Sequence, residues 1–193
     1  MTKNFVLASG NAHKAQEFGE LFPKEILNIE AAPNKLDVIE DGKTFRDNAL
    51  LKAEAYYKKL GVPVLADDSG LVVAALPDEL GIHSARFGGD GLTDKDRAFL
   101  LLDRMKEEEN RAAYFVCVLC FYLNEKEVYF FEGRVEGSIG PLYQGDKGFG
   151  YDPVFIPADG EGSLTMAQLP DWKNIHSHRA VACRYAKDFF ASK

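Results

Sequence analysis

The residues best suited to chemistry stand in one acidic stretch, Asp67-Asp68-Ser69-Gly70, directly after the apolar run at residues 62–66. The run predicts a buried strand, and carboxylates at the carboxyl end of such a strand lie where open α/β sheets bind ligands. Because neighbouring carboxylates repel, a divalent cation is the simplest neutralising group, with one carboxylate on the metal and the other handling a proton. The stretch also suits a polar turn before the apolar residues 71–73, so both interpretations stand.

A second candidate site lies where a predicted strand at residues 4–8 gives way to a helix at residues 12–22. The junction reads Ser9-Gly10-Asn11, and its small residues let backbone N–H groups approach a phosphate. The amino end of the helix favours an anion, and Lys14 stands one turn in, where its ammonium can reach the same anion. Ser9 or Asn11 could equally serve as an ordinary helix cap, which leaves both readings open.

The stretch Gly42-Lys43-Thr44 resembles the end of a phosphate-binding P-loop but fails the rest of that pattern. The signature requires a glycine at position 37, where this chain has Asp37. Glu40 and Asp41 would also repel a triphosphate from the would-be cradle. Glu40 is therefore a candidate metal ligand instead, placed just before a helix.

The clearest predicted helix spans residues 44–60. Thr44 and Asp47 resemble a capping box at its start, and Gly61 follows its end. Asn48 and Lys52 stand four residues apart and therefore share a face, where Lys52 could bind a ligand or simply be solvated. Apolar side chains recur at helical spacing: Phe45, Ala49, Ala53, Tyr56 and Leu60.

Two segments near the carboxyl end have the side chains that recognise a planar base. Phe149, Tyr151 and Asp152 lie among glycines at residues 148–153, and aromatics on such a loop can stack on a base while a carboxylate accepts its ring N–H groups. Lys173 and the stretch Ser177-His178-Arg179 place several donors at the start of the last helix. A plain turn with half-buried aromatics, and a capping serine with solvated neighbours, are the alternatives.

The predicted elements mix strands and helices without strict alternation, which indicates an α/β chain with a long mixed sheet. No internal repeat or linker interrupts the chain. The strands are expected at residues 4–8, 27–31, 62–66, 71–76, 112–123, 127–136 and 154–156. The helices are expected at residues 12–22, 44–60, 94–108 and 177–191, and a glycine-rich loop at residues 137–150.

Composition narrows the classes of partner. The net charge of −7 leaves no broad basic surface, which argues against binding nucleic acid or a membrane surface. No apolar run approaches the roughly 20 residues of a membrane span, and no secretory signal precedes the first strand, so we expect a cytoplasmic protein. Its three cysteines fit a reducing compartment. Cys117 and Cys120 lie in one predicted strand, where residues three apart face opposite sides, and we expect both thiols to be buried and structural.

Taken in order, these motifs resemble the inosine triphosphate pyrophosphatase (Ham1-like) family, and the resemblance covers nearly the whole chain. The segments that carry it are Leu7-Ala8-Ser9-Gly10-Asn11 with Lys14, Thr44-Phe45 through Asn48 to Leu51-Lys52-Ala53, Ala66-Asp67-Asp68-Ser69-Gly70-Leu71, Gly81-Ile82 with Ser84-Ala85-Arg86-Phe87, Gly148-Phe149-Gly150-Tyr151-Asp152-Pro153, and Ser177-His178-Arg179.

The resemblance implies Mg²⁺-dependent hydrolysis of ITP, dITP and XTP to the nucleoside monophosphate and pyrophosphate. It also implies one domain over residues 1–193, with two lobes around a central substrate cleft, and a homodimer. The residues implied to bind phosphates are Ser9, Asn11, Lys14 and Lys52. Those implied to place Mg²⁺ are Glu40, Asp67 and Asp68, with Asp68 also the base that activates water. Those implied to form the base pocket are Ser69, Phe149, Tyr151, Asp152, Lys173, His178 and Arg179.

Two rival functions remain at this point. A Maf-like pyrophosphatase shares the general architecture and acts on modified nucleotides, but the Ser-His-Arg and Gly-Phe-Gly-Tyr-Asp-Pro segments argue against it. A non-catalytic nucleotide sensor is disfavoured by the presence of both Asp67 and Asp68.

Overall fold

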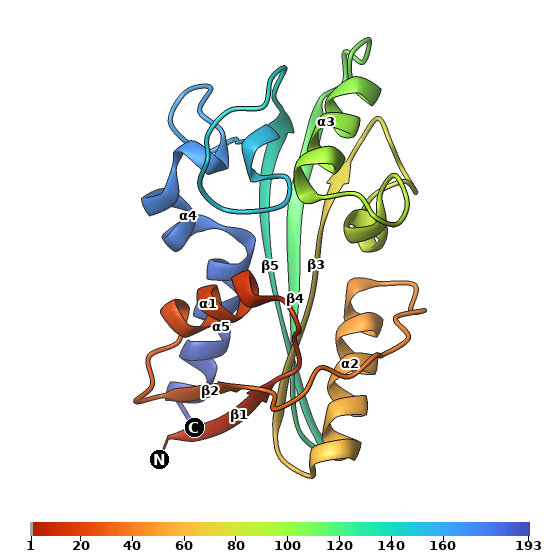
Figure 1. Ribbon diagram of the computed structural model, residues 1–193. Helices are drawn as coiled ribbons and strands as arrows, with labels where there is room; N and C mark the ends of the chain where they lie inside the picture. The colour runs from red at the N-terminus through yellow and green to blue at the C-terminus, as the bar shows by residue number, and fades with distance from the viewer. Residues whose placement is uncertain (1) are drawn as a thin grey trace. The chain divides into compact units, whose positions relative to one another are not determined.

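The computed structural model describes residues 2–193, which form a six-stranded sheet in the order β2-β1-β3-β4-β5-β6 (Figure 1). β1 pairs in parallel with β2 and β3, whereas β5 and β6 pair antiparallel, so the expected α/β class with a mixed sheet is confirmed. The strands are β1 (Lys3–Leu7), β2 (Leu27–Ala31), β3 (Val64–Val73), β4 (Ala112–Asn124), β5 (Glu127–Ile139) and β6 (Phe155–Pro157). The α-helices are α1 (Ala12–Leu21), α2 (Phe45–Leu60), α3 (Asp94–Arg104), α4 (Pro170–His176) and α5 (His178–Ala191).

The chain forms two compact units, each with its own buried core. The first unit contains residues 2–68, Cys117–Gly133 and Arg179–Lys193, and the second contains Ser69–Val116 and Arg134–His178. β3, β4 and β5 each contribute residues to both units. The expectation of a single domain with a cleft between two lobes stays a prediction.

In the first unit, helices cover both faces of the strands, with α1 and α5 on one side and α2 on the other (Figure 1). Side chains along β4 point alternately to the two faces of the sheet, so every second residue contributes to the core on the side of α1 and α5. Leu119 and Phe121 of β4 pack there with Phe5 and with Phe190 of α5. The ring centroids of Phe121 and Phe5 lie 5.0 Å apart in an edge-on arrangement.

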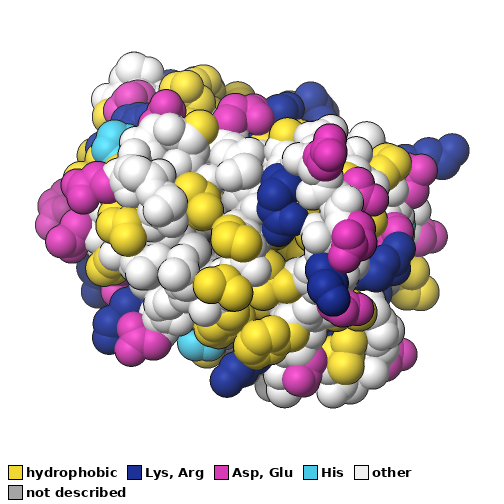
Figure 2. Space-filling model, turned by 90° about the horizontal axis from the view of Figure 1, so that it is seen from above, with side chains coloured by type: hydrophobic (Ala, Val, Ile, Leu, Met, Phe, Trp, Pro, Cys, Tyr) yellow, Lys and Arg dark blue, Asp and Glu magenta, His cyan; other side chains and the backbone are white. Residues whose placement is uncertain are grey.

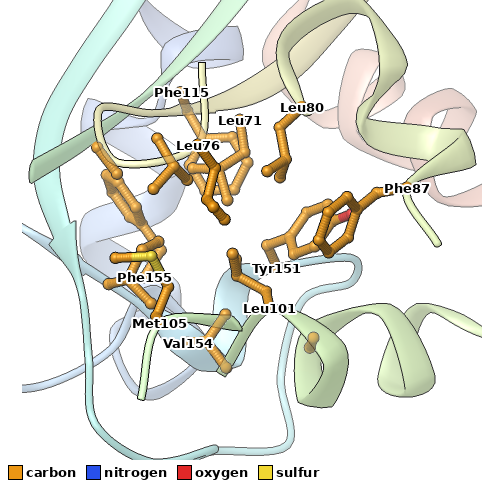
Figure 3. Packing of buried hydrophobic residues seen from close by; sticks show 14 of the residues in the cluster. Leu71, Leu76, Leu80, Phe87, Leu101, Met105, Phe115, Tyr151, Val154 and Phe155 are labelled. Atoms are coloured by element: carbon orange, nitrogen blue, oxygen red, sulfur yellow. The ribbon is translucent and has the colours of Figure 1, made fainter. Parts of the chain in front are cut away.

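The second unit is organised around a cluster that joins β3, α3, β4, β5 and β6. α3 begins at a capping box formed by Thr93 and Asp96 and buries Leu101 completely. Figure 3 shows the close packing of this cluster, with the Tyr151 side chain directed into it. The loop that carries Tyr151 is therefore anchored by hydrophobic burial.

The prediction of two strands separated by an acidic turn is wrong. β3 runs without interruption through Asp67-Asp68-Ser69-Gly70, and its first eight residues are all buried except Ser69, which is half-buried. It is β1 that ends here, since Leu7 pairs with Leu65 and the Ala8 N–H donates to the Leu65 carbonyl at 2.8 Å. The sequence suggested that a strand ends next to the acidic residues. The strand that ends there is β1, and β3 continues past it.

Other differences concern short elements and ends. α4 was not predicted, because seven residues opened by Pro170 show too little periodicity to be recognised. β5 extends to Ile139, into the predicted loop, where it pairs with Phe155. α3 ends at Arg104, short of the predicted residue 108. The capping box of Thr44 and Asp47 on α2 is confirmed.

The cysteine prediction is confirmed. Cys117 lies in the core of the first unit with a pKa raised to about 12, mainly by burial. Cys120 is outside that core cluster, and burial raises its pKa to about 12 as well. The three cysteines are free and buried, as expected for structural thiols.

The visible surface is mixed in charge. On the face that Figure 2 shows, Lys and Arg side chains lie among Asp and Glu rather than forming one continuous basic area. Among residues 2–193, no helix has both the length and the apolar character needed to cross a bilayer.

Candidate functional site

Asp67 lies at the centre of a buried ion-pair cluster in the first unit. Its carboxylate Oδ2 is 2.7 Å from the Lys14 ammonium and 3.5 Å from Nη2 of Arg179, and its side chain is 1% exposed. Burial alone would raise the pKa of Asp67, but the cations of Lys14, Arg179 and Lys52 outweigh it and hold that pKa well below its ordinary value. Asp67 is therefore a carboxylate at every physiological pH.

Asp68 has a different environment, although it is the next residue. Successive side chains of a strand point to opposite faces, so Asp68 meets α2, where Asn48 Nδ2 donates to its Oδ2 at 3.2 Å. Burial raises the pKa of Asp68 to about 6, against the smaller lowering effects of Lys52, Lys14 and Asn48. A carboxylate with a pKa near neutrality is suited to accept a proton from water.

Lys52 of α2 joins the two sides of this region. Its ammonium donates to the backbone carbonyl of Asp67 at 2.9 Å and lies 2.9 Å from the Glu40 carboxylate. Burial alone would lower the pKa of Lys52, but Asp67, Glu40 and Asp68 raise it above the ordinary value. Lys52 therefore remains a cation.

The loop after β1 caps α1, which is one of the two roles that the sequence left open, and phosphate binding stays a prediction. Asn11 caps α1, its side-chain oxygen accepting from the N–H groups of His13 and Lys14, and Ser9 Oγ accepts from the Asn11 N–H at 3.1 Å. Gly10 and Asn11 are exposed. The cap fixes the start of the helix and so delivers Lys14 to Asp67.

Arg179 lies in the same cluster as Asp67. The residue is 1% exposed, and its guanidinium donates to the Glu17 carboxylate and lies 5.6 Å from the centre of the Phe18 ring. Burial alone would lower the pKa of Arg179, but Cys117, Asp67 and Glu17 raise it. Arg179 thus lies with the carboxylates Asp67 and Glu17 of the first unit, and its implied role in the base pocket stays a prediction.

In the second unit, Asp152 and Lys173 form a buried pair. The Lys173 ammonium donates to Asp152 Oδ2 at 2.8 Å, and the Phe149 N–H donates to the same oxygen at 2.9 Å. The Lys173 ammonium also lies 4.8 Å from the centre of the Phe149 ring. Gly148 has φ +76°, and a Cβ there would meet Asp152 Oδ2 at 2.1 Å, so only glycine fits.

The remaining residues assigned to the base pocket have distinct surroundings. The Tyr151 hydroxyl donates to the Ser84 carbonyl at 2.7 Å, and its ring is 6% exposed in the core, which suits support of the loop better than stacking on a base. His178 stacks on Phe115 with the ring centroids 4.7 Å apart. Ser69 follows Asp68 in β3 and is half-buried.

Comparison with known proteins gives this arrangement a context. The family model described as "Ham1 family" matches residues 5–189. The chain belongs to the Ham1 family.

Curated Ham1 relatives match along almost their entire length. A dITP/XTP pyrophosphatase of Leptospira interrogans is 38% identical over all of both chains. A dITP/XTP pyrophosphatase of Geobacillus kaustophilus is 43% identical, over 93% of this chain and 90% of the relative.

Solved Ham1 structures agree with the fold. The Ham1 protein of Staphylococcus aureus superposes with a TM-score of 0.86 and 38% identity, covering 98% of this chain and 99% of that one. The Ham1 protein of Coxiella burnetii gives a TM-score of 0.87 and 34% identity, covering 99% and 100%.

Two further residues, which were not among the predicted site residues, contact candidate site residues. Glu17 pairs with Arg179, and its signal was helical spacing, because it stands one turn after Lys14 on α1. Asn48 was noted only for sharing a face with Lys52, yet its side chain donates to Asp68 and accepts from the Gly42 N–H. Nothing local in the sequence indicates that these polar groups meet.

Proposed function

We propose that this chain hydrolyses the non-canonical purine nucleoside triphosphates dITP, ITP and XTP to the nucleoside monophosphate and pyrophosphate. The observation that carries the proposal is the full-length match to relatives named dITP/XTP pyrophosphatase, on a chain that keeps Lys14, Lys52 and the Asp67-Asp68 pair together. The enzyme is a hydrolase of phosphoanhydride bonds.

The residues of the first unit bind the triphosphate and activate water. Ser9, Asn11, Lys14 and Lys52 bind the phosphates, because they surround the end of β1 with N–H donors and cations. Asp68 takes a proton from the attacking water, the bond between the α- and β-phosphates breaks, and pyrophosphate leaves. Hydrolysis of this kind depends mainly on positioning and charge neutralisation.

A divalent cation, Mg²⁺ by family resemblance, is the proposed cofactor. Among residues 2–193, no three His, Cys, Asp or Glu side chains are grouped to hold a metal alone. That fits Mg²⁺, which proteins bind through one or two carboxylates together with substrate phosphates. Asp67, Asp68 and Glu40 supply suitable oxygens. If the Lys14 and Lys52 ammonium groups bind phosphates instead of their present partners, the negative charges of Asp67 and Glu40 are left for a metal to neutralise. When bound, the metal neutralises charge that develops on the phosphate oxygens.

The base is recognised by Phe149, Asp152, Lys173 and His178, with Ser69, Tyr151 and Arg179 in support. Donors such as the Lys173 ammonium suit the 6-keto oxygen of hypoxanthine or xanthine, and Asp152 suits a ring N–H group. Adenine presents an amino donor at position 6, which would leave buried donors unpaired. Such mismatches cost about 10⁴-fold or more in the best cases.

The same resemblance supports three further proposals: a homodimer, a cytoplasmic location, and a small-molecule nucleotide rather than nucleic acid as the partner. The net charge of −7 agrees with the last of these.

The test is release of pyrophosphate, against orthophosphate, from dITP, ITP, XTP, GTP and ATP, with Mg²⁺ and with a chelator. We expect metal-dependent pyrophosphate from dITP, ITP and XTP, and turnover of GTP and ATP that is slower by orders of magnitude. With a modified pyrimidine nucleoside triphosphate added as a further substrate, turnover of that nucleotide only would favour the Maf-like activity, and nucleotide binding without any turnover would favour a sensor.

A further inference from the structure

Residues 32–43, between β2 and α2, form an irregular segment that contacts α2 at several points along the helix. Three contacts each join the segment to a side chain of the helix. They are Leu36 N–H to the Tyr56 hydroxyl at 2.9 Å, Glu40 to the Lys52 ammonium at 2.9 Å, and Gly42 N–H to Asn48 Oδ1 at 2.9 Å. Since Asn48 and Lys52 also contact the acidic pair, the segment is part of the support of the phosphate site.

Lys35, in the same segment, packs its side chain against Gly10 of the loop that follows β1. A Cβ built on Gly10 would lie 2.6 Å from Lys35 Cδ and 3.0 Å from both Cγ and Cε, so the lysine stem occupies the space that a side chain at position 10 would need. Gly10 has no positive φ, so its lack of a side chain serves this close approach rather than an unusual backbone. The packed stem confines the Lys35 ammonium to the neighbourhood of Ser9 and Asn11.

Lys35 differs from the neighbouring lysines, Lys14 and Lys52, in its ion pairing. Lys14 pairs with Asp67, and Lys52 pairs with Glu40. For Lys35, no ion pair is formed with any of residues 2–193, and the side chain is exposed. A third ammonium at this loop can therefore turn to a phosphate without leaving a carboxylate uncompensated.

We propose that Lys35 is a further substrate-binding residue, whose ammonium contacts the triphosphate at the Ser9-Gly10-Asn11 loop while its stem packs on Gly10. This inference depends on the proposed function, because the ligand is the triphosphate of that reaction. Lys35 acts on binding and not on the chemical step, since the proposed base, Asp68, lies in β3 against Asn48 of α2.

The experiment compares Lys35→Met, which keeps most of the stem and removes the charge, with Lys24→Met as the matched control. Lys24 is exposed in the same unit and shares none of these contacts. We expect Lys35→Met to raise the KM for dITP and the inhibition constant of inorganic pyrophosphate by about fivefold, with kcat unchanged and Lys24→Met equal to wild type. The difference should shrink as salt is raised, because the contact is exposed.

A second variant tests the packing on Gly10. Gly10→Ala places a methyl group where the Lys35 stem lies, and it should raise the KM for dITP in the wild-type background but add nothing in the Lys35→Met background. If Lys35→Met has the KM and pyrophosphate inhibition of the wild type, the inference is overturned. If wild type itself fails to hydrolyse dITP, it is the proposed function that fails, and pyrophosphate binding still tests Lys35.

Discussion

At the scale of single residues, Asp67 and Asp68 differ because successive side chains of one strand point to opposite faces. Asp67 faces Lys14 and Arg179 and is held ionised, whereas Asp68 faces Asn48 and has a pKa near 6. Adjacent carboxylates are thus suited to different tasks: Asp67 to pairing with cations, and Asp68 to the proposed proton exchange.

Asp68→Asn should abolish turnover of dITP while leaving its KM or binding constant within about threefold of wild type, because the amide keeps the shape and removes the base. In wild type, the rate should fall as the pH falls through about 6, where Asp68 becomes protonated. Steady-state kinetics and calorimetric titration of dITP measure both effects. Near-normal kcat in the variant would remove Asp68 from the role of base.

Asp67→Asn should instead destabilise the fold, by about 3 kcal/mol at pH 7, because Lys14 and Arg179 lose their buried partner. The pKa of Asp67 is lowered in the folded state, so its contribution is fully present above its unfolded pKa of about 4 and is lost as the pH falls below it. Urea unfolding without metal at pH 7 and at a pH well below 4 measures this. Asp68→Asn is the control, and equal stabilities of the two variants at pH 7 would contradict the assignment.

At the scale of elements, the loop at residues 148–152 depends on glycines for two separable reasons. Gly148 and Gly150 both have positive φ, but a Cβ at Gly148 would strike Asp152, whereas one at Gly150 would meet nothing within 4 Å. The Gly150 N–H donates to Asp94 at 3.1 Å and fixes the loop to the start of α3.

Gly148→Ala should therefore displace the Asp152 and Lys173 pair and lower the ratio of kcat/KM for dITP over ATP by more than tenfold. Gly150→Ala is the matched control, because it introduces only backbone strain, of about 1–2 kcal/mol, and should keep that ratio. The two variants are compared by pyrophosphate release from both nucleotides. An unchanged ratio in Gly148→Ala would remove the pair from base recognition.

Some elements could be predicted because their signals are local. Thr44 and Asp47 mark the start of α2 and Gly61 marks its end, and each of these signals involves residues close together in the sequence. The alternation of side chains along β4 correctly placed Cys117 and Cys120 on different faces. The acidic turn was wrong because Asp, Ser and Gly favour turns locally, and only tertiary contacts reveal the strand. The Leu71 N–H, for example, donates to Ser84 Oγ at 3.0 Å.

The site could be predicted only in part, for a similar reason. The resemblance supplied Lys14, Lys52 and Asp67, which the structure brings together. The ion pair of Arg179 with Glu17 joins residues 162 apart, and no local pattern reports such a distance.

At the scale of the whole molecule, two cores are linked by three strands that run through both units. This continuity predicts that the units unfold together, since loss of one core exposes strands that the other requires. The single tryptophan, Trp172, lies in the second unit and reports on it alone.

Phe121→Ala, in the core of the first unit, should cost about 3–5 kcal/mol and lower the thermal midpoint seen by Trp172 fluorescence. Circular dichroism should give the same midpoint. Phe131→Leu, at the edge of the same cluster, should cause a much smaller shift. An unchanged Trp172 midpoint with a biphasic circular dichroism curve would show that the units unfold independently.

The uninterrupted course of β3 also limits how this chain can change in evolution. One residue inserted in the strand ahead of Asp67 would reverse the direction of every side chain after it and exchange the surroundings of the two carboxylates. Insertions and deletions should therefore be tolerated in irregular segments such as residues 158–164, and selected against between Val64 and Asp68.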